Sequence, residues 1–250
     1  MKKLSAVIIC KNEAHNIDRC LSSLGFADEI IVYDSGSVDE TLNICRKYHC
    51  EIHQADQWQG FGIAKKTAVD FAHNDWVFVI DADEAVSDAL NDFLIGFKNE
   101  KESLYAYRIK RISYYLGKQV RYCGWQNDYT LRLFNRQFAQ FNDKIVHESV
   151  QTSHPVGQIE YLIHHYTYPQ ISTHIQKMTA YAYLGAEQAY QKGKKSSIPY
   201  AVLNGLLKFV KMYVIKLGFL DGKTGLILSM NSAFGVYLKY ICLWEKWKKI

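Results

Sequence analysis

The sequence has few prolines, and its cysteines lack the spacing of a metal-binding motif. The chain of 250 residues has 3 prolines, and its 6 cysteines form no C-x-x-C pair. Scattered cysteines are typical of reduced thiols in a cytosolic protein, so a disulfide scaffold and a zinc finger are both excluded. No G-x-G-x-x-G motif follows the first apolar run, so the dinucleotide-binding version of an α/β fold is unsupported.

Long apolar runs are missing as well. A membrane-spanning helix needs about 20 apolar residues, and the longest run free of charged residues and histidine, 224–238, is shorter and contains Ser and Asn. The apolar stretch that follows Met1, Lys2 and Lys3 is too short for the core of a signal peptide. We therefore expect a chain that does not cross a membrane.

Acidic residues and arginine are rare in the last third of the chain. From residue 171 onward there are 12 lysines, no arginine and 3 acidic residues, a net charge of +9. The first 170 residues carry 18 basic and 22 acidic side chains, a net charge of −4. A basic, aromatic extension on a slightly acidic body predicts an anionic partner, such as lipid headgroups or nucleic acid.

The first hundred residues alternate between strand and helix patterns. Apolar runs predict strands over 4–10, 29–33, 50–53 and 76–80, and helical spacing predicts helices over 13–24, 37–48 and 63–73. The second helix is expected to open with a capping box formed by Ser37 and Glu40. Strands separated by helices of about ten residues predict an α/β fold with a doubly wound, parallel sheet.

The rest of the chain changes character. Segments 104–111 and 129–134 are β-like, so we expect antiparallel strands that complete a mixed sheet and form the acceptor side of a cleft. From residue 172 the pattern is helical, and over 200–217 one arc holds a set of polar residues: Asn204, Lys208, Lys211 and Lys216. Such a helix either packs with its lysines outward or lies in a membrane interface. The same aromatic and lysine mixture over 237–250 favours the interface.

Carboxylates concentrate where the predicted strands end. Asp81, Asp83 and Glu84 directly follow the apolar run 76–80. Each could be a helix cap or a solvated side chain, but carboxylates at this edge of an α/β sheet are also the oxygen ligands that Mg²⁺ or Mn²⁺ takes beside a substrate diphosphate. Two further sets follow the first two strands: Asn12 with Glu13, and Asp34. Their convergence on one rim predicts a metal-assisted nucleotide site.

These motifs resemble a known family. The runs V-I-I-C-K-N-E, Y-D-S-G-S-V-D-E-T and D-W-V-F-V-I-D-A-D-E are similar to the inverting GT-A glycosyltransferases of family 2, over about the first 90 residues. The stretches 125–134, 146–148 and 165–168 resemble the branch that adds glucose to the inner-core heptose of lipopolysaccharide or lipooligosaccharide, which extends the likeness to about residue 190.

The resemblance implies a GT-A catalytic domain over 1–170, with a donor half over about 1–100 and an acceptor half over about 101–170. Residues 171–250 are expected to form a helical, basic, membrane-associating extension. It implies a UDP-glucose donor, a divalent cation, a lipid-linked core oligosaccharide as acceptor and an anionic membrane surface, with no nucleic acid partner. The expected location is cytoplasmic, peripheral on the inner face of the inner membrane. Three alternatives stay open: another UDP-sugar or glycolipid acceptor, a nucleotidyltransferase, and a non-catalytic nucleotide-sugar-binding protein.

Roles on the donor side follow from the same resemblance. Asp34 matches the residue that reads the uracil, and Asn12 and Glu13 match the loop beside the nucleotide. Asp81 matches the position that holds the ribose or sugar, and Asp83 matches the metal ligand. Lys65 lies in the segment that lines the nucleotide site in the family, although a solvated helix face explains it equally well.

The acceptor side needs a general base, because an inverting transfer removes the proton of the attacking hydroxyl. Glu148 is the favoured base, with Asp128 next and Asp143 as a further candidate. His165 matches a downstream histidine that reaches the metal or the diphosphate, but aromatic packing explains it too, and His164 is an alternative. Two residues complete the set as acceptor-binding candidates, Arg132 for an acceptor phosphate and Trp125.

Overall fold

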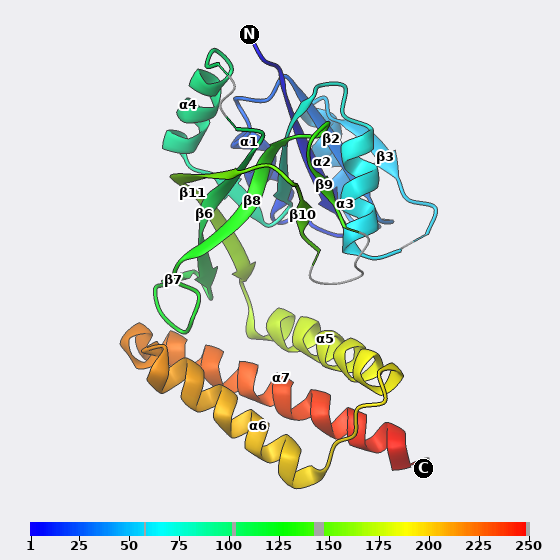
Figure 1. The fold of residues 1–250 in the computed structure, drawn as a ribbon, viewed down its shortest axis with the longest axis vertical. Coiled ribbons are helices and arrows are strands. Elements are labelled where there is room, and N and C mark those ends of the chain that lie inside the picture. The colour runs from blue at the N-terminus through cyan, green and yellow to red at the C-terminus, as the bar shows by residue number, and fades with distance from the viewer. Residues whose placement is uncertain (58, 102–103, 143–147, 249–250) are drawn as a thin grey trace. The chain divides into compact units, whose positions relative to one another are not determined.

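The computed structural model describes residues 1–57, 59–101, 104–142 and 148–248 (Figure 1). The chain forms two compact units. The first consists of Met1–Arg111 and Asn127–His165, and the second consists of Ile112–Gln126 and Tyr166–Ile250. Residues 112–126, which the sequence placed in the acceptor half, are thus grouped with the C-terminal helices.

Four parallel strands form one half of the sheet in the first unit. They are β1 (Leu4–Cys10), β2 (Glu29–Asp34), β3 (Glu51–Gln54) and β4 (Trp76–Asp81), in the spatial order β3-β2-β1-β4. Each lies where the sequence predicted a strand. The helices between them are α1 (Ile17–Ser22), α2 (Thr41–Lys47) and α3 (Phe61–Asp70), so the predicted doubly wound α/β arrangement is confirmed.

Strands from later in the chain extend the sheet. Beyond β4 the order continues with β8 (Asp128–Asn135), β6 (Ala106–Tyr115), β11 (Val156–Tyr168) and β5 (Glu84–Val86), and β7 (Lys118–Val120) pairs with β6. A separate two-stranded sheet joins β9 (Gln140–Phe141) to β10 (Val150–Gln151). The contacts of β4 with β8 and of β6 with β8 are antiparallel, as predicted for a mixed sheet. The short strand β5 and the long strand β11 had not been foreseen.

Both faces of the parallel strands are buried. On β1, Leu4, Ala6 and Ile8 belong to a cluster that includes residues of α1, of α2 and of α4 (Asp88–Phe97). Val7 and Ile9 instead belong to a cluster with residues of α3, which covers the other face. A strand buried on both faces has apolar residues at successive positions, which explains the uninterrupted apolar runs in the sequence.

The predicted capping box at the start of α2 is wrong. The helix begins at Thr41, and the backbone N–H of Thr41 donates to Asp39 Oδ1 at 3.1 Å. Ser37 has another task, because its hydroxyl donates to the carboxylate of Asp34 and accepts from the N–H of Asn12. A serine with a glutamate three residues later fits both arrangements, so the pattern alone does not distinguish a cap from a loop anchor.

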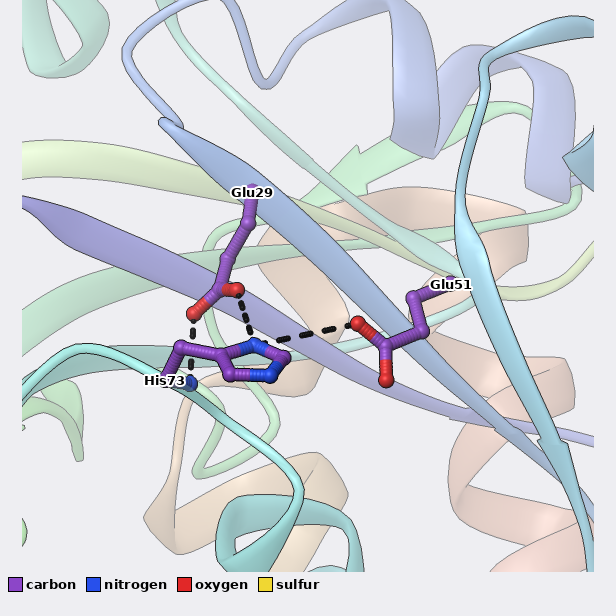
Figure 2. Close-up of side chains that lie close together, drawn as sticks. All are labelled: Glu29, Glu51 and His73. Atoms are coloured by element: carbon purple, nitrogen blue, oxygen red, sulfur yellow. Dashed lines mark hydrogen bonds and ion pairs between the residues drawn. The ribbon is translucent and has the colours of Figure 1, made fainter.

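The opposite edge of the sheet, where the parallel strands begin, carries a chain of ion pairs (Figure 2). His73 Nδ1 lies 2.8 Å from Glu29 Oε2 and 3.8 Å from Glu51 Oε2. The hydrogen bond that His73 donates to Glu29 and the charges of both glutamates raise the pKa of His73. Because Glu29 begins β2 and Glu51 begins β3, the histidine links two neighbouring strands to the segment before β4.

Three helices dominate the second unit. They are α5 (Ile171–Gln191), α6 (Ile198–Val210), which continues into the π-helical turn η1 (Lys211–Ile215), and α7 (Gly222–Lys248), which follows the 3-10 turn η2 (Gly218–Asp221). Helix α7 contacts both α5 and α6 (Figure 1). The helical extension expected from the sequence is therefore present.

Two helical stretches of this unit, Ile198–Ile215 and Gly218–Lys248, are long and apolar enough to cross a membrane, judged by length and composition. Only 17% and 22% of their most apolar windows are buried. The expectation that no segment reaches this length is wrong, because it considered uninterrupted uncharged runs. Isolated lysines break such a run without making the segment polar on average.

Candidate active site

The strand register brings the carboxyl ends of three strands together. Cys10, at the end of β1, pairs with Asp34 at the end of β2, and Ile9 pairs with Asp81 at the end of β4. Asp34 and Asp81 therefore lie on either side of the last residues of β1, at the edge where ligands bind in open α/β sheets. The convergence expected from the sequence is present in the backbone.

Asp34 anchors the loop after β2. Its side chain is fully buried, and its carboxylate accepts the N–H groups of Gly36 and Ser37 at 3.1 and 3.0 Å. Gly36 has a positive φ of 90°, which residues with a side chain rarely adopt, so the tight turn depends on glycine. The carboxylate thus fixes the shape of this loop, and the reading of a uracil by Asp34 stays a prediction.

Asn12 and Glu13 tie the loop after β1 to the loop after β2. Asn12 Oδ1 accepts the N–H of Val38 at 2.9 Å, and the N–H of Glu13 donates to Thr41 Oγ1 at 2.8 Å. Asn12 has φ 56°, in the left-handed region that asparagine tolerates better than most residues. The two loops therefore form one hydrogen-bonded rim, and its contact with a nucleotide stays a prediction.

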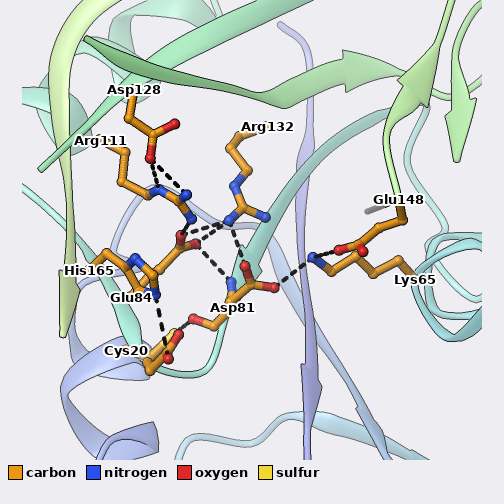
Figure 3. A network of polar contacts seen from close by, with 10 residues as sticks. Cys20, Lys65, Asp81, Glu84, Arg111, Asp128, Arg132, Glu148 and His165 are labelled. Carbon is orange, nitrogen blue, oxygen red and sulfur yellow. Dashed lines mark hydrogen bonds and ion pairs between the residues drawn. The ribbon is translucent and has the colours of Figure 1, made fainter. Parts of the chain in front are cut away.

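Lys65 joins two of the predicted site carboxylates (Figure 3). Its Nζ lies 2.8 Å from Asp81 Oδ1 and 2.8 Å from Glu148 Oε1. The side chain is 5% exposed, so the alternative of a solvated helix face is wrong. Burial alone would lower the pKa of Lys65, but the charges of Asp81 and Glu148 outweigh it and raise the pKa. A buried ammonium therefore holds the end of β4 against the segment that carries Glu148.

Arg132 contacts the other oxygen of Asp81. Its Nη2 lies 2.6 Å from Asp81 Oδ2 and 2.6 Å from Glu84 Oε1. Burial would raise the pKa of Asp81, but the charges of Arg132 and Lys65 hold that pKa well below its usual range. Asp81 is therefore a carboxylate at neutral pH. The structure places the guanidinium of Arg132 inside this network, and its contact with an acceptor phosphate stays a prediction.

Glu84 is the buried centre of the network. The residue is 1% exposed, its Oε1 accepts from Arg111 Nη1 at 2.9 Å, and its Oε2 accepts the N–H of Asp81 at 3.0 Å. Arg111 also holds Asp128, whose Oδ2 lies 2.8 Å from Nε and 2.7 Å from Nη2. Arg111 and Asp128 are direct partners across strands β6 and β8. The candidate base Asp128 is thus fixed by the same arginine that supports Glu84.

Replacing Arg132 with alanine is expected to lower the free energy of unfolding by about 3 kcal/mol, because removal of one partner leaves buried carboxylates uncompensated. Urea denaturation followed by circular dichroism measures the change. Arg108→Ala, at an exposed position of β6, is the matched control and should change the stability by less than about 0.5 kcal/mol. Equal losses in the two variants would contradict the structural role assigned to Arg132.

Asp83 lies in the turn between β4 and β5, next to His165. Glu84 pairs with His165 in the register of β5 and β11, and this pairing brings His165 Nε2 to 3.5 Å from Asp83 Oδ2. Two ligands of one octahedral cation with bonds of about 2.1 Å lie about 3 Å apart, so an oxygen and an imidazole nitrogen at this spacing fit a shared divalent ion. The residues predicted as metal ligands are thus brought together, and their binding of a metal stays a prediction.

Two of the predicted residues cannot be assigned to this network. Trp125 belongs to the second unit, where it packs against a cluster of Tyr115, Val120, Cys123, Met212 and Leu228. Its contact with an acceptor stays a prediction. Asp143, the third candidate base, lies outside the described residues.

The sequence interpretation did not foresee the arginine partners of Glu84, nor any role of Arg111. Glu84 was interpreted as a cap or a scaffold residue, and its contacts agree with a scaffold role, because two arginines share its carboxylate. Neither residue gave a local signal. The burial of Glu84 follows from the short strand β5, which is visible only in the structure, and only the pairing of β6 with β8 brings Arg111 to Asp128.

Known proteins resemble this chain in sequence. The model of the family Glycosyl transferase family 2 matches residues 5–152. A protein of Rickettsia typhi described as an uncharacterized glycosyltransferase is 32% identical, over 98% of this chain and 88% of its own length. The lipopolysaccharide core biosynthesis glycosyltransferase LpsC of Rhizobium meliloti is 26% identical, over 95% of this chain and 93% of its own length.

A solved structure agrees with the fold. The 1–349 fragment of S. aureus TarS in complex with UDP-GlcNAc superposes with a TM-score of 0.50 at 14% identity, over 99% of this chain and 92% of that chain. At this identity the likeness concerns the arrangement of helices and strands alone.

Proposed function

The chain belongs to glycosyl transferase family 2, and from this premise we propose that it transfers glucose from UDP-glucose to the inner-core heptose of lipopolysaccharide or lipooligosaccharide, with inversion at the anomeric carbon. Membership makes the protein a glycosyltransferase, so the alternatives of a nucleotidyltransferase and of a non-catalytic binding protein are wrong. The description of LpsC supports a core oligosaccharide as the acceptor.

The observation that carries the proposal is a set of three contacts at the end of β4. Lys65 holds Asp81 and Glu148 at 2.8 Å each, while Asp83 lies 3.5 Å from His165. A donor site and a candidate base thus share one buried lysine, and two candidate metal ligands lie beside them. This combination suits displacement of a diphosphate from a sugar by an external hydroxyl.

The chain's own residues supply the proton transfer. The acceptor oxygen forms a bond to the anomeric carbon as the bond from that carbon to the diphosphate oxygen breaks, and the hydroxyl proton passes to Glu148. Lys65 orients the Glu148 carboxylate through Oε1. Asp81 is held as a carboxylate by Arg132 and Lys65 and can accept hydrogen bonds from the ribose or the sugar of the donor.

A divalent cation fits the proposed site. Asp83 and His165 would hold it, and when bound it would neutralise the charge that develops on the leaving UDP. We propose Mg²⁺ or Mn²⁺, since both take carboxylate oxygens.

The lysine-rich second unit would hold the enzyme at the membrane that carries its acceptor. Its charge of +9 over residues 171–250 suits the anionic lipids of the cytoplasmic face of the inner membrane, where we propose that the enzyme is peripherally bound. No nucleic acid partner is proposed.

A thermal-shift screen tests the donor and the cation together. We expect UDP-glucose with Mn²⁺ to raise the melting temperature of the full chain more than either alone, because ligands that bind the folded state stabilise it. UDP-galactose and UDP-N-acetylglucosamine serve as competing donors. GDP-mannose, which carries guanine in place of uracil, serves as the control for recognition of the nucleobase. A larger shift in melting temperature with another UDP-sugar would identify that sugar, instead of UDP-glucose, as the donor. The absence of a shift with any UDP-sugar would refute the proposed donor class.

A further inference from the structure

Helix α6 packs with its small residues inward and its large apolar residues outward. Ala201 and Gly205 are buried, while Leu206 and Leu207 are 60% and 56% exposed. At Gly205 an added Cβ would lie 3.2 Å from the Cβ of Tyr237, so this face of α6 lies close against α7. A surface helix of a water-soluble domain has the opposite pattern, whereas small residues at the interface and large ones outside are typical of helices in contact with lipid.

Exposed apolar side chains are not confined to Leu206 and Leu207. Others lie on α6, η1, η2 and α7, which contact one another, and each is more than 40% exposed: Val202, Leu203, Val210, Val214, Ile215, Leu217, Phe219, Leu220, Met230 and Phe234. Helices α6 and α7, with the turns η1 and η2 between them, form a helical hairpin. We call this set of residues, with Leu206 and Leu207, the apolar face of the hairpin. Monomeric soluble proteins rarely expose so many large apolar side chains on neighbouring elements without a partner.

The charge of the unit selects the partner. Residues 171–250 carry 12 lysines against 3 acidic residues. A second copy of the chain would bring two segments 171–250, each of charge +9, against each other, which opposes association through this face. An anionic bilayer complements the charge, since lysines beside an apolar helix face bind headgroups while the face itself contacts acyl chains.

The ends of the hairpin argue against a membrane-spanning arrangement. The turn between α6 and α7 is bonded to the loop at β7, because Asp221 accepts the N–H of Arg121 and the N–H of Cys123 donates to Lys216 O. That loop is joined directly to β6 and β8 of the enzyme's sheet. At the other end α6 is preceded by Lys192, Lys194 and Lys195. Spanning would leave these lysines on the far side, against the normal distribution of charge.

We propose that the apolar face of the hairpin lies in the plane of an anionic bilayer, with its side chains among the upper acyl chains and the lysines of the unit on the headgroups. This rests on the membrane location proposed above, and it makes apolar insertion rather than charge alone the basis of binding.

Vesicle flotation of the full chain tests the inference without donor or acceptor, so it is independent of the sugar chemistry. With phosphatidylcholine vesicles that contain 30% phosphatidylglycerol, we expect binding that persists in part at 1 M NaCl. The double variant Leu206→Glu/Leu207→Glu should bind at least tenfold less. The matched control is Ile95→Glu on α4 of the first unit, where Ile95 is 46% exposed, and it should bind like the unchanged chain.

A second variant keeps the test valid if the glutamates disturb folding. Leu206→Trp retains an apolar side chain, and its fluorescence should be quenched by lipids with brominated acyl chains, whereas that of Ile95→Trp should gain no quenching over the unchanged chain. Undiminished binding by the double glutamate variant, or complete loss of wild-type binding in 1 M NaCl, would overturn the inference. So would a lipid-free dimer that the double variant dissociates.

Discussion

Replacing Asp83 with alanine is expected to lower kcat for sugar transfer by about four orders of magnitude while the protein stays folded. Asp83 lies in a turn between β4 and β5 beside His165, at the position proposed to hold the cation. Several kcal/mol of charge stabilisation on the leaving diphosphate depend on such an ion, and each 1.36 kcal/mol corresponds to about tenfold in rate. Release of UDP with a heptose-containing core acceptor measures the loss.

Two controls separate a metal ligand from a structural residue. Asp92→Ala removes an exposed carboxylate from α4, nearby in the sequence, and should leave kcat within about twofold of the unchanged enzyme. In the Asp83 variant, the additional stabilisation that Mn²⁺ gives in the presence of UDP-glucose should also disappear. If Asp83→Ala turned over at a rate near that of Asp92→Ala, the metal assignment would fail.

The sequence predicted the parallel half of the sheet well, and the reason is physical. Strands such as β1 and β4 are buried on both faces, so nearly every side chain in them is apolar and the run is visible without a structure. The carboxyl ends of parallel strands lie on one edge, so Asp34 and Asp81 could be placed together from their positions alone.

The missed features depend on contacts between distant parts of the chain. Glu84 has its role because Arg132 and Arg111 reach it from β8 and β6, and no local pattern encodes that pairing. Helix α6 was expected either to pack with its lysines outward or to lie in a membrane interface. The close contact with α7 places Gly205 inward and leaves Leu206 exposed, and a helical wheel alone cannot tell which side of the helix is covered.

The choice of the general base is the most consequential open step, and the two described candidates have different surroundings. Glu148 shares Lys65 with Asp81, so its carboxylate is tied to the end of β4 where the donor is proposed to bind. Asp128 is held through one oxygen by two nitrogens of Arg111, in an arrangement that pairs β6 with β8. This contrast favours Glu148 as the group that takes the proton and Asp128 as a residue that positions Arg111.

Glu148→Gln is therefore expected to lower kcat by about a thousandfold, within the range of a lost general base, while the affinity for UDP-glucose changes little. Glutamine keeps the shape of the side chain, and its carbonyl oxygen can still accept the hydrogen bond from Lys65. Asp128→Asn is the matched comparison and should lower kcat less than tenfold. Single-turnover rates measure the chemical step, and calorimetric titration with UDP-glucose measures binding.

The two variants decide which carboxylate is the general base, because each outcome assigns the transferred proton to a different residue. If Asp128→Asn loses the chemical step with intact donor binding and Glu148→Gln does not, Asp128 is the base and Lys65 serves to orient Asp81. If both variants keep the step, neither described carboxylate takes the proton, which leaves Asp143 of the earlier candidates. Loss of donor affinity together with rate in Glu148→Gln would instead make Glu148 part of the donor site through its bond to Lys65.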